Sequence, residues 1–193
     1  MIADAIALHG AMGVHRLNHA VLYVRDVEQT KAFYEGVLGF RVVMEMPGAA
    51  FFQAPGSSND HDLGTFQIGS AAAPSDAGRG TVGLYHLAWE VDTLAELQRL
   101  AGALRASGAL AGASDHGTTK SLYAHDPDGL EFEVVWIIPA ALLNADDLAA
   151  RSTIRPLDLP AEIARFGADE LGGVGISTLV APRSSAAHSV PTT

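Results

Sequence analysis

Two histidines and one glutamate stand at positions that could hold a metal ion. Residues 17–19 (LNH) and 84–86 (LYH) match at an offset of 67, and each triplet ends in a histidine, His19 or His86. Glu133 belongs to a later strand-like run. The chain contains no cysteine, so a metal would need imidazole and carboxylate ligands. Two histidines and one carboxylate suit non-haem Fe(II) or a similar divalent ion that keeps open coordination positions.

A predicted β-hairpin positions Glu133. Residues 126–129 (DPDG) are typical of a tight turn, because proline fixes φ at the second position and glycine tolerates positive φ at the last. Residues 130–136 alternate, which places Glu131 and Glu133 on one face and Phe132, Val134 and Trp136 on the other. The alternative interpretation is that both carboxylates are solvated strand residues. The matching histidines favour a ligand role for Glu133.

The two histidines begin two similar units, each with the pattern βαβββ. In the first we expect strands at 17–24, 40–44, 50–53 and 63–68, with a helix capped by Asp26. In the second we expect strands at 84–91, 110–113, 121–125 and 130–137, with a helix capped by Thr93. The predicted fold class is α+β: two βαβββ modules in tandem that form a curved mixed sheet around a metal cleft.

The predicted organisation has five parts. A flexible leader (1–13) precedes the first module (14–70), and a small, turn-rich linker (71–83) leads to the second module (84–138). The C-terminal extension (139–193) contains short amphipathic helices at 142–151 and 160–166 and a tail at 182–193 with disorder-like composition. Its sequence indicates no particular chemistry.

Aligning the last strands of the two units suggests a fourth position in the candidate metal site, besides His19, His86 and Glu133. Gln67 follows His19 by 48 residues and Glu133 follows His86 by 47, which places Gln67 opposite Glu133. If the strand at 63–68 extends back to residue 61, His61 shares a face with Gln67. The alternatives are a core or rim histidine for His19 and His86, and a solvated loop histidine for His61.

Composition excludes several classes of partner. The formal net charge of −10 argues against nucleic acid and anionic membranes. The longest apolar run is interrupted by Pro139 and is too short to span a bilayer. The first twelve residues lack a basic start, so they make a poor signal peptide, and we expect a cytoplasmic protein.

At 17–43 (LNHAVLYVRDVEQTKAFYEGVLGFRVV), 84–91 (LYHLAWEV) and 126–136 (DPDGLEFEVVW), the chain resembles the vicinal oxygen chelate superfamily. Residues 58–66 (SNDHDLGTF) and 114–129 (SDHGTTKSLYAHDPDG) resemble the small type I extradiol dioxygenases, which cleave catechols. That resemblance implies metal ligands at His19, His86 and Glu133. It implies Fe(II), with Mn(II) as the alternative ion, and a small aromatic diol and dioxygen as substrates.

The resemblance also implies catalytic residues. His61 matches an acid and base outside the first coordination shell, and Tyr123 matches a hydrogen-bond donor to bound substrate oxygen. His116, with Asp115, matches a loop at the mouth of the site. The relatives usually cover their open sheet edges by pairing, so we also expect a homodimer.

Two other functions remain open on the same fold. A glyoxalase-type isomerase or transferase would need a carboxylate at the fourth position, where the alignment places the amide of Gln67. A non-catalytic antibiotic-binding protein of this fold would have no reason to keep three metal ligands.

Overall fold

The structure is a computed structural model that describes residues 14, 16–78 and 80–173. The chain divides into two compact units, Met1–Ala72 and Ala73–Thr193. The predicted leader (1–13) and tail (182–193) lie outside the described residues. No helix in the described ranges is long and apolar enough to cross a membrane.

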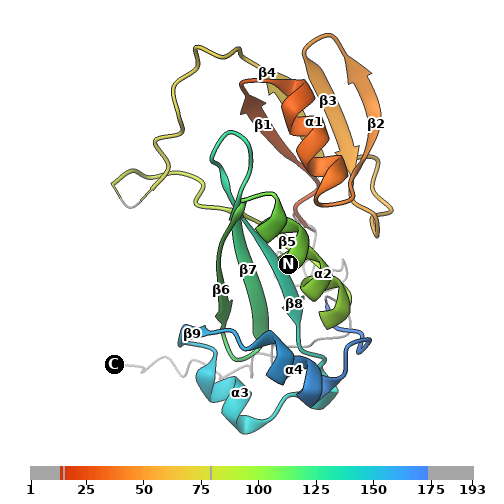
Figure 1. The fold of residues 1–193 in the computed structure, drawn as a ribbon, viewed down its shortest axis with the longest axis vertical. Coiled ribbons are helices and arrows are strands. Elements are labelled where there is room, and N and C mark those ends of the chain that lie inside the picture. The colour runs from red at the N-terminus through yellow and green to blue at the C-terminus, as the bar shows by residue number, and fades with distance from the viewer. Residues whose placement is uncertain (1–13, 15, 79, 174–193) are drawn as a thin grey trace, which may run out of the picture. The chain divides into compact units, whose positions relative to one another are not determined.

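The first unit contains one helix and a four-stranded mixed sheet (Figure 1). The strand order is β1-β4-β3-β2, in which β1 runs parallel to β4 and the other pairs are antiparallel. The helix α1 lies across one face of this sheet. The bounds are β1 (Ala20–Val24), α1 (Val27–Gly36), β2 (Arg41–Met46), β3 (Ala49–Gln53) and β4 (Leu63–Gln67).

Local sequence explains where α1 begins and which face of the sheet it covers. The Asp26 carboxylate accepts hydrogen bonds from the backbone amides of the first turn, which confirms the predicted N-cap. Tyr34 is buried on the helix and Phe52 on the sheet, with ring centroids 5.8 Å apart. Leu63 and Thr65 are fully buried. Leu63 and Thr65 of β4 therefore belong to the core.

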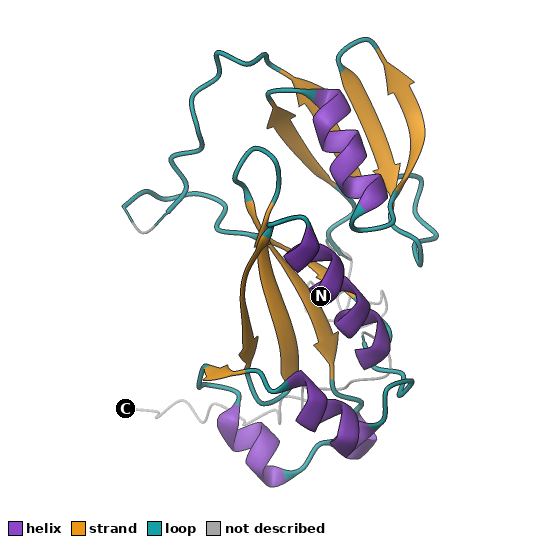
Figure 2. Cartoon of the chain, viewed as in Figure 1, coloured by secondary structure: helices purple, strands orange, loops and turns teal. Residues whose placement is uncertain are grey.

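The second unit repeats this plan and extends it (Figure 2). Its five-stranded sheet has the order β5-β8-β7-β6-β9, with β5 parallel to β8. The helix α2 packs against the sheet and against α4. The bounds are β5 (Leu87–Glu90), α2 (Leu94–Ala106), β6 (Leu110–Asp115), β7 (Thr119–His125), β8 (Glu131–Ile137), η1 (Ala140–Leu142), α3 (Ala145–Ala150), β9 (Arg155–Pro156) and α4 (Leu159–Phe166).

The hairpin β7–β8 forms as predicted. The backbone amide of Gly129 donates to the carbonyl of Asp126 at 2.9 Å, and Gly129 has a φ of 84°. In β8, Phe132 and Trp136 are buried, whereas the alternate residues are half-buried. The face that carries Glu133 is thus the face opposite the core.

The fold class and both βαβββ modules are confirmed, with three differences. The strands belong to two mixed sheets, one in each unit, and not to a single curved sheet. His19 and His86 precede β1 and β5, although we expected both histidines within these strands. The predicted helix 142–151 is a short 3₁₀ turn followed by α3, and the helix 160–166 corresponds to α4.

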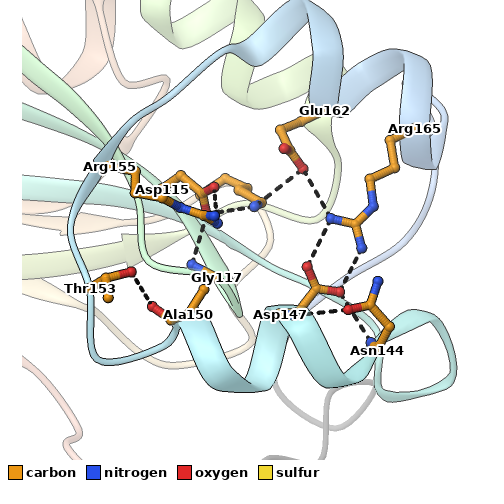
Figure 3. A network of polar contacts seen from close by, with 10 residues as sticks. Asp115, Gly117, Asn144, Asp147, Ala150, Thr153, Arg155, Glu162 and Arg165 are labelled. Atoms are coloured by element: carbon orange, nitrogen blue, oxygen red, sulfur yellow. Dashed lines mark hydrogen bonds and ion pairs between the residues drawn. The ribbon is translucent and has the colours of Figure 1, made fainter.

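An ion pair in the second unit gives a test of stability against pH. The buried Asp147 carboxylate accepts two hydrogen bonds from Arg165, at 2.8 and 2.6 Å, and caps α3 with Asn144 (Figure 3). Burial raises the pKa of Asp147, but Arg165 and the Asn144 amide outweigh burial and hold this pKa below its usual value. The ionised carboxylate is therefore favoured in the folded state.

We expect Asp147→Asn to lower the free energy of unfolding by about 1–3 kcal/mol at neutral pH, because it weakens a charge-assisted pair. The folded pKa is depressed, so this contribution is present above the unfolded pKa of about 3.9 and is lost as pH falls through the folded value. Urea unfolding followed by tryptophan fluorescence would measure it, since both tryptophans lie in the second unit. The exposed Asp146→Asn is the control. If the parent and Asp147→Asn differ in free energy of unfolding by the same amount at acid pH as at neutral pH, the stabilising role of the ionised Asp147 carboxylate is contradicted.

Candidate functional site

His86 and Glu133 face each other in the second unit. The Nε2 atom of His86 lies 3.2 Å from Oε2 of Glu133, and its Nδ1 atom lies 3.7 Å from Oε1 of Glu131. Both glutamates come from the half-buried face of β8, and His86 lies just before β5, the strand that pairs with β8. The imidazole therefore sits between two carboxylates from one strand.

Tyr123 and His116 continue this group on the neighbouring strand and loop. Tyr123 pairs with Glu133 in the β7–β8 register, and its hydroxyl donates to Oε1 of Glu133 at 3.5 Å. The Nε2 atom of His116 lies 2.9 Å from the same hydroxyl. Burial and the neighbouring Glu133 raise the pKa of Tyr123 to about 12, so its hydroxyl stays protonated at neutral pH. The structure thus brings His86, Glu133, Tyr123 and His116 together in one unit.

His19 and His61 form a second group, in the first unit. Their ring centroids are 4.5 Å apart. Asn59 holds the two segments together, because its side-chain amide donates to the backbone carbonyls of Asn18 and His61, each at 2.7 Å. His61 is half-buried, and His19 is exposed. The two histidines therefore meet beside the start of β1 and β4.

Neighbouring oxygen atoms orient both rings. The Nδ1 atom of His19 lies 2.7 Å from the Asn18 side-chain oxygen, and Nδ1 of His61 lies 2.9 Å from a carboxylate oxygen of Asp60. When Nδ1 donates to such an acceptor, the Nε2 atom keeps its lone pair for a metal or a proton. With Nδ1 donating to Asp60, the Nε2 atom of His61 would have the free lone pair that a general base requires.

Strand alternation, which was the supporting argument for His61, does not hold, although His61 does lie beside His19. Alternation would place His61 on the face of Gln67, which also includes Leu63 and Thr65, but the side chains of Leu63 and Thr65 are fully buried against α1. Because β4 begins at Leu63, strand alternation does not extend back to His61. Instead the ring of His61 makes an edge contact with Phe51, at a centroid distance of 5.2 Å.

The predicted equivalence of Gln67 and Glu133 is also wrong. In the first unit Val21 pairs with Gly64, and in the second Ala88, which is 67 residues after Val21, pairs with Glu133. Gly64 therefore occupies the place of Glu133 in the repeat. Gln67 lies three residues further on, and its side-chain oxygen accepts a hydrogen bond from the backbone amide at the start of α1. The first unit therefore has no side chain at the position equivalent to Glu133.

The chemistry of the donor set fits a divalent metal ion. Two ligand atoms that bind one ion in adjacent positions at about 2.1 Å lie roughly 3 Å apart, and the His86–Glu133 separation is 3.2 Å. Among the described residues of either unit, no three His, Asp or Glu side chains are grouped as a metal site. In the second unit, His86 just before β5 and Glu133 of β8 place two possible donor atoms at this distance.

Three residues beside the candidate histidines were not predicted to contact them. Asn18, Asp60 and Glu131 each place an oxygen atom near Nδ1 of a candidate histidine. A signal for each was present in the sequence. Asn18 and Asp60 directly precede a candidate histidine, and Glu131 shares the strand face of Glu133 by alternation.

Comparison with known proteins identifies the family. Residues 16–134 match the model of the Glyoxalase/Bleomycin resistance protein/Dioxygenase superfamily. The chain is 34% identical over 115 residues to biphenyl-2,3-diol 1,2-dioxygenase 3 of Rhodococcus globerulus, which covers 59% of each chain. It is 30% identical over 118 residues to catechol-2,3-dioxygenase of Bacillus subtilis (strain 168), covering 61% of this chain and 40% of that one. The chain therefore matches only part of each relative.

A solved structure supports the fold. A glyoxalase/dioxygenase from Nostoc punctiforme superposes with a TM-score of 0.53 at 20% sequence identity, covering 66% of this chain and 97% of that one. At this identity the likeness concerns the fold alone.

Proposed function

This chain belongs to the Glyoxalase/Bleomycin resistance protein/Dioxygenase superfamily, and from that membership we propose that it cleaves the ring of a catechol-type aromatic diol with dioxygen. The observation that carries the proposal is the group formed by His86, Glu133 and Tyr123. A phenol that stays protonated lies beside a carboxylate suited to a metal, and an imidazole faces that carboxylate at 3.2 Å. The similarity to dioxygenases that act on aromatic diols supports the same chemistry.

We assign the metal ligands to His19, His86 and Glu133, the set that suits Fe(II), with Mn(II) as the alternative ion. The bound ion would supply Lewis-acid binding of the two diol oxygens and electron transfer to dioxygen. Both oxygen atoms of dioxygen enter the product, and the carbon–carbon bond next to the diol breaks. The product is a ring-opened semialdehyde acid or its ketone analogue.

The protein's own side chains bind the diol and move its proton. His61 takes a proton from a diol hydroxyl at Nε2, because Asp60 accepts a hydrogen bond at Nδ1. The His61 ring returns that proton later in the reaction. The Tyr123 hydroxyl donates a hydrogen bond to substrate oxygen, and His116 orients this hydroxyl from 2.9 Å.

The two other functions on this fold have less support. A glyoxalase-type reaction would require a carboxylate at the fourth position of the repeat, where Gly64 stands. A non-catalytic antibiotic-binding protein would not need the hydrogen bonds that orient His19 and His61. Neither alternative explains why Tyr123 lies beside Glu133.

Oxygen uptake separates these functions. The Fe(II)-loaded protein would be mixed with catechol or with biphenyl-2,3-diol in an oxygen electrode while the absorbance of the ring-opened product is followed. We expect one dioxygen consumed for each diol opened. Isomerisation of a thiol adduct without oxygen uptake would support the glyoxalase function. Drug binding by a protein that turns over neither substrate would support the binding function.

Glu131 is expected to strengthen metal binding without being a ligand itself. Its carboxylate lies 3.7 Å from Nδ1 of His86, a buried atom with no hydrogen-bond partner among the described residues. A carboxylate in that position can hold a ligand imidazole in the correct tautomer. We expect Glu131→Ala to weaken metal binding by about 10- to 100-fold without abolishing it. Competition with a metal chelator measures this, and unchanged affinity would contradict the role.

We also propose a homodimer. Each sheet is open, with β1 and β2 at the edges of one and β5 and β9 at the edges of the other. Unpaired edge strands are commonly covered by association. Light scattering at micromolar concentration is expected to give twice the chain mass of 20.1 kDa. A mass equal to that of one chain would contradict this proposal.

A further inference from the structure

The C-terminal extension contributes to a charged network around Asp115 and Gly117, at the loop between β6 and β7 (Figure 3). His116 lies in this loop. The Asp115 carboxylate is 7% exposed and lies at the end of β6. One of its oxygens accepts hydrogen bonds from Lys120 at 2.6 Å and from the Gly117 amide at 2.8 Å. The other accepts from Arg155 of β9 at 2.7 Å. Three donors thus fix one buried carboxylate.

Lys120 ties this network to α4. Its side chain is fully buried, and its ammonium lies 3.2 Å from a carboxylate oxygen of Glu162. A buried charge is costly unless it is paired, so Lys120 requires both Asp115 and Glu162. Burial raises the pKa of Asp115, but Lys120, the Gly117 amide and Arg155 outweigh burial and hold that pKa below its usual value. Two carboxylates and two cations from β6, β7, β9 and α4 therefore form one paired cluster.

Backbone packing fixes the same loop from the side of α3. Gly117 has a φ of 76°, and a Cβ at this position would overlap the carbonyl oxygen of Asp147. No larger residue would fit without movement of α3. On either side of it, His116 donates its backbone amide to Thr119 and Thr118 donates to His116. The backbone of His116 is thus held between the network and α3.

We propose that Arg155 is a positioning residue that sets His116 against Tyr123, so that the C-terminal extension belongs to the catalytic apparatus. The link is short: Arg155 binds Asp115, the residue before His116, and His116 lies 2.9 Å from the Tyr123 hydroxyl. This inference rests on the proposed function for its effect on turnover. The placement of His116 itself does not depend on that function.

The test uses Arg155→Met in the full chain, with Arg155→Lys as the conservative variant. The side chain of Arg155 is 52% exposed, so its replacement leaves the buried Asp115–Lys120 pair in place and the chain is expected to fold. Arg151→Met is the matched control, since Arg151 is exposed on the same segment and its guanidinium makes no hydrogen bond or ion pair with the described residues.

The first readout is the imidazole nitrogen NMR signal of His116 in metal-free protein, assigned with His116→Gln. We expect Arg155→Met to shift this signal toward its position in Tyr123→Phe, and Arg155→Lys and Arg151→Met to leave it near the parent value. The second readout is kinetic: Arg155→Met should lower kcat by roughly 10- to 100-fold, with a smaller change in KM, as expected for a misplaced group.

The outcomes separate the two proposals. A shifted His116 signal in a protein that cleaves no diol supports the positioning role and overturns the proposed function. Diol cleavage with an unchanged His116 signal and unchanged kcat in Arg155→Met overturns the positioning role alone. An equal loss of kcat in Arg151→Met would show a general effect of charge and would also overturn it.

Discussion

Replacing Glu133 with alanine is expected to remove the bound metal and abolish ring cleavage. The same result is expected for His19→Ala and His86→Ala. Each variant leaves two ligands of three, and the lost imidazole or carboxylate is replaced by water, which binds the ion more weakly. Purified parent protein should hold about one divalent ion per chain, and elemental analysis of the parent and the three variants measures the loss. Full occupancy in all three variants would show that the ligand set is wrong.

Gln67→Ala is the matched control for this experiment. If Gln67 were the repeat equivalent of Glu133, its removal would weaken metal binding. The strand register assigns that place to Gly64, and the Gln67 side chain binds the start of α1. We therefore expect Gln67→Ala to keep its metal and its turnover, with a small loss of stability.

His61→Ala is expected to lower turnover by about 10²- to 10⁴-fold, the usual range for a positioned proton-transfer group. Its metal content should stay near that of the parent, because we place His61 outside the ligand set. The diol would still be held by its two oxygens, so KM should change less than kcat. Iron content measured beside oxygen consumption gives both quantities.

His125→Ala is the control for a histidine near the site without a role in it. Its side chain is 48% exposed and lies 3.9 Å from Glu131. We expect parent-like turnover and metal content. Loss of iron in His61→Ala would make His61 a ligand, and unchanged turnover would make it a surface residue.

Short-range patterns predicted much of the fold. The turn at 126–129, the caps at Asp26 and Thr93 and the two faces of β8 each depend on residues within one turn or strand. The match between the segments that end at His19 and His86 likewise reflects one repeated unit. These features need no knowledge of distant contacts.

The register between strands that are distant in the sequence could not be predicted from local patterns. Gly64, and not Gln67, is the equivalent of Glu133, because the register between β1 and β4 is set by packing beneath α1 and not by counting residues. The alternation argument for His61 failed for a similar reason, because it extended the strand beyond its start at Leu63. The burial of Lys120 was also hidden, since its partner Glu162 lies 42 residues away in α4.

Isotopically labelled dioxygen tests the central claim most directly. The Fe(II)-loaded protein would be supplied with labelled dioxygen and an aromatic diol that it consumes, and the product would be analysed by mass spectrometry. The account predicts a ring-opened product that carries both labelled oxygen atoms, and no such product from Glu133→Ala. Full metal loading with no labelled product from catechol or biphenyl-2,3-diol would contradict the dioxygenase function.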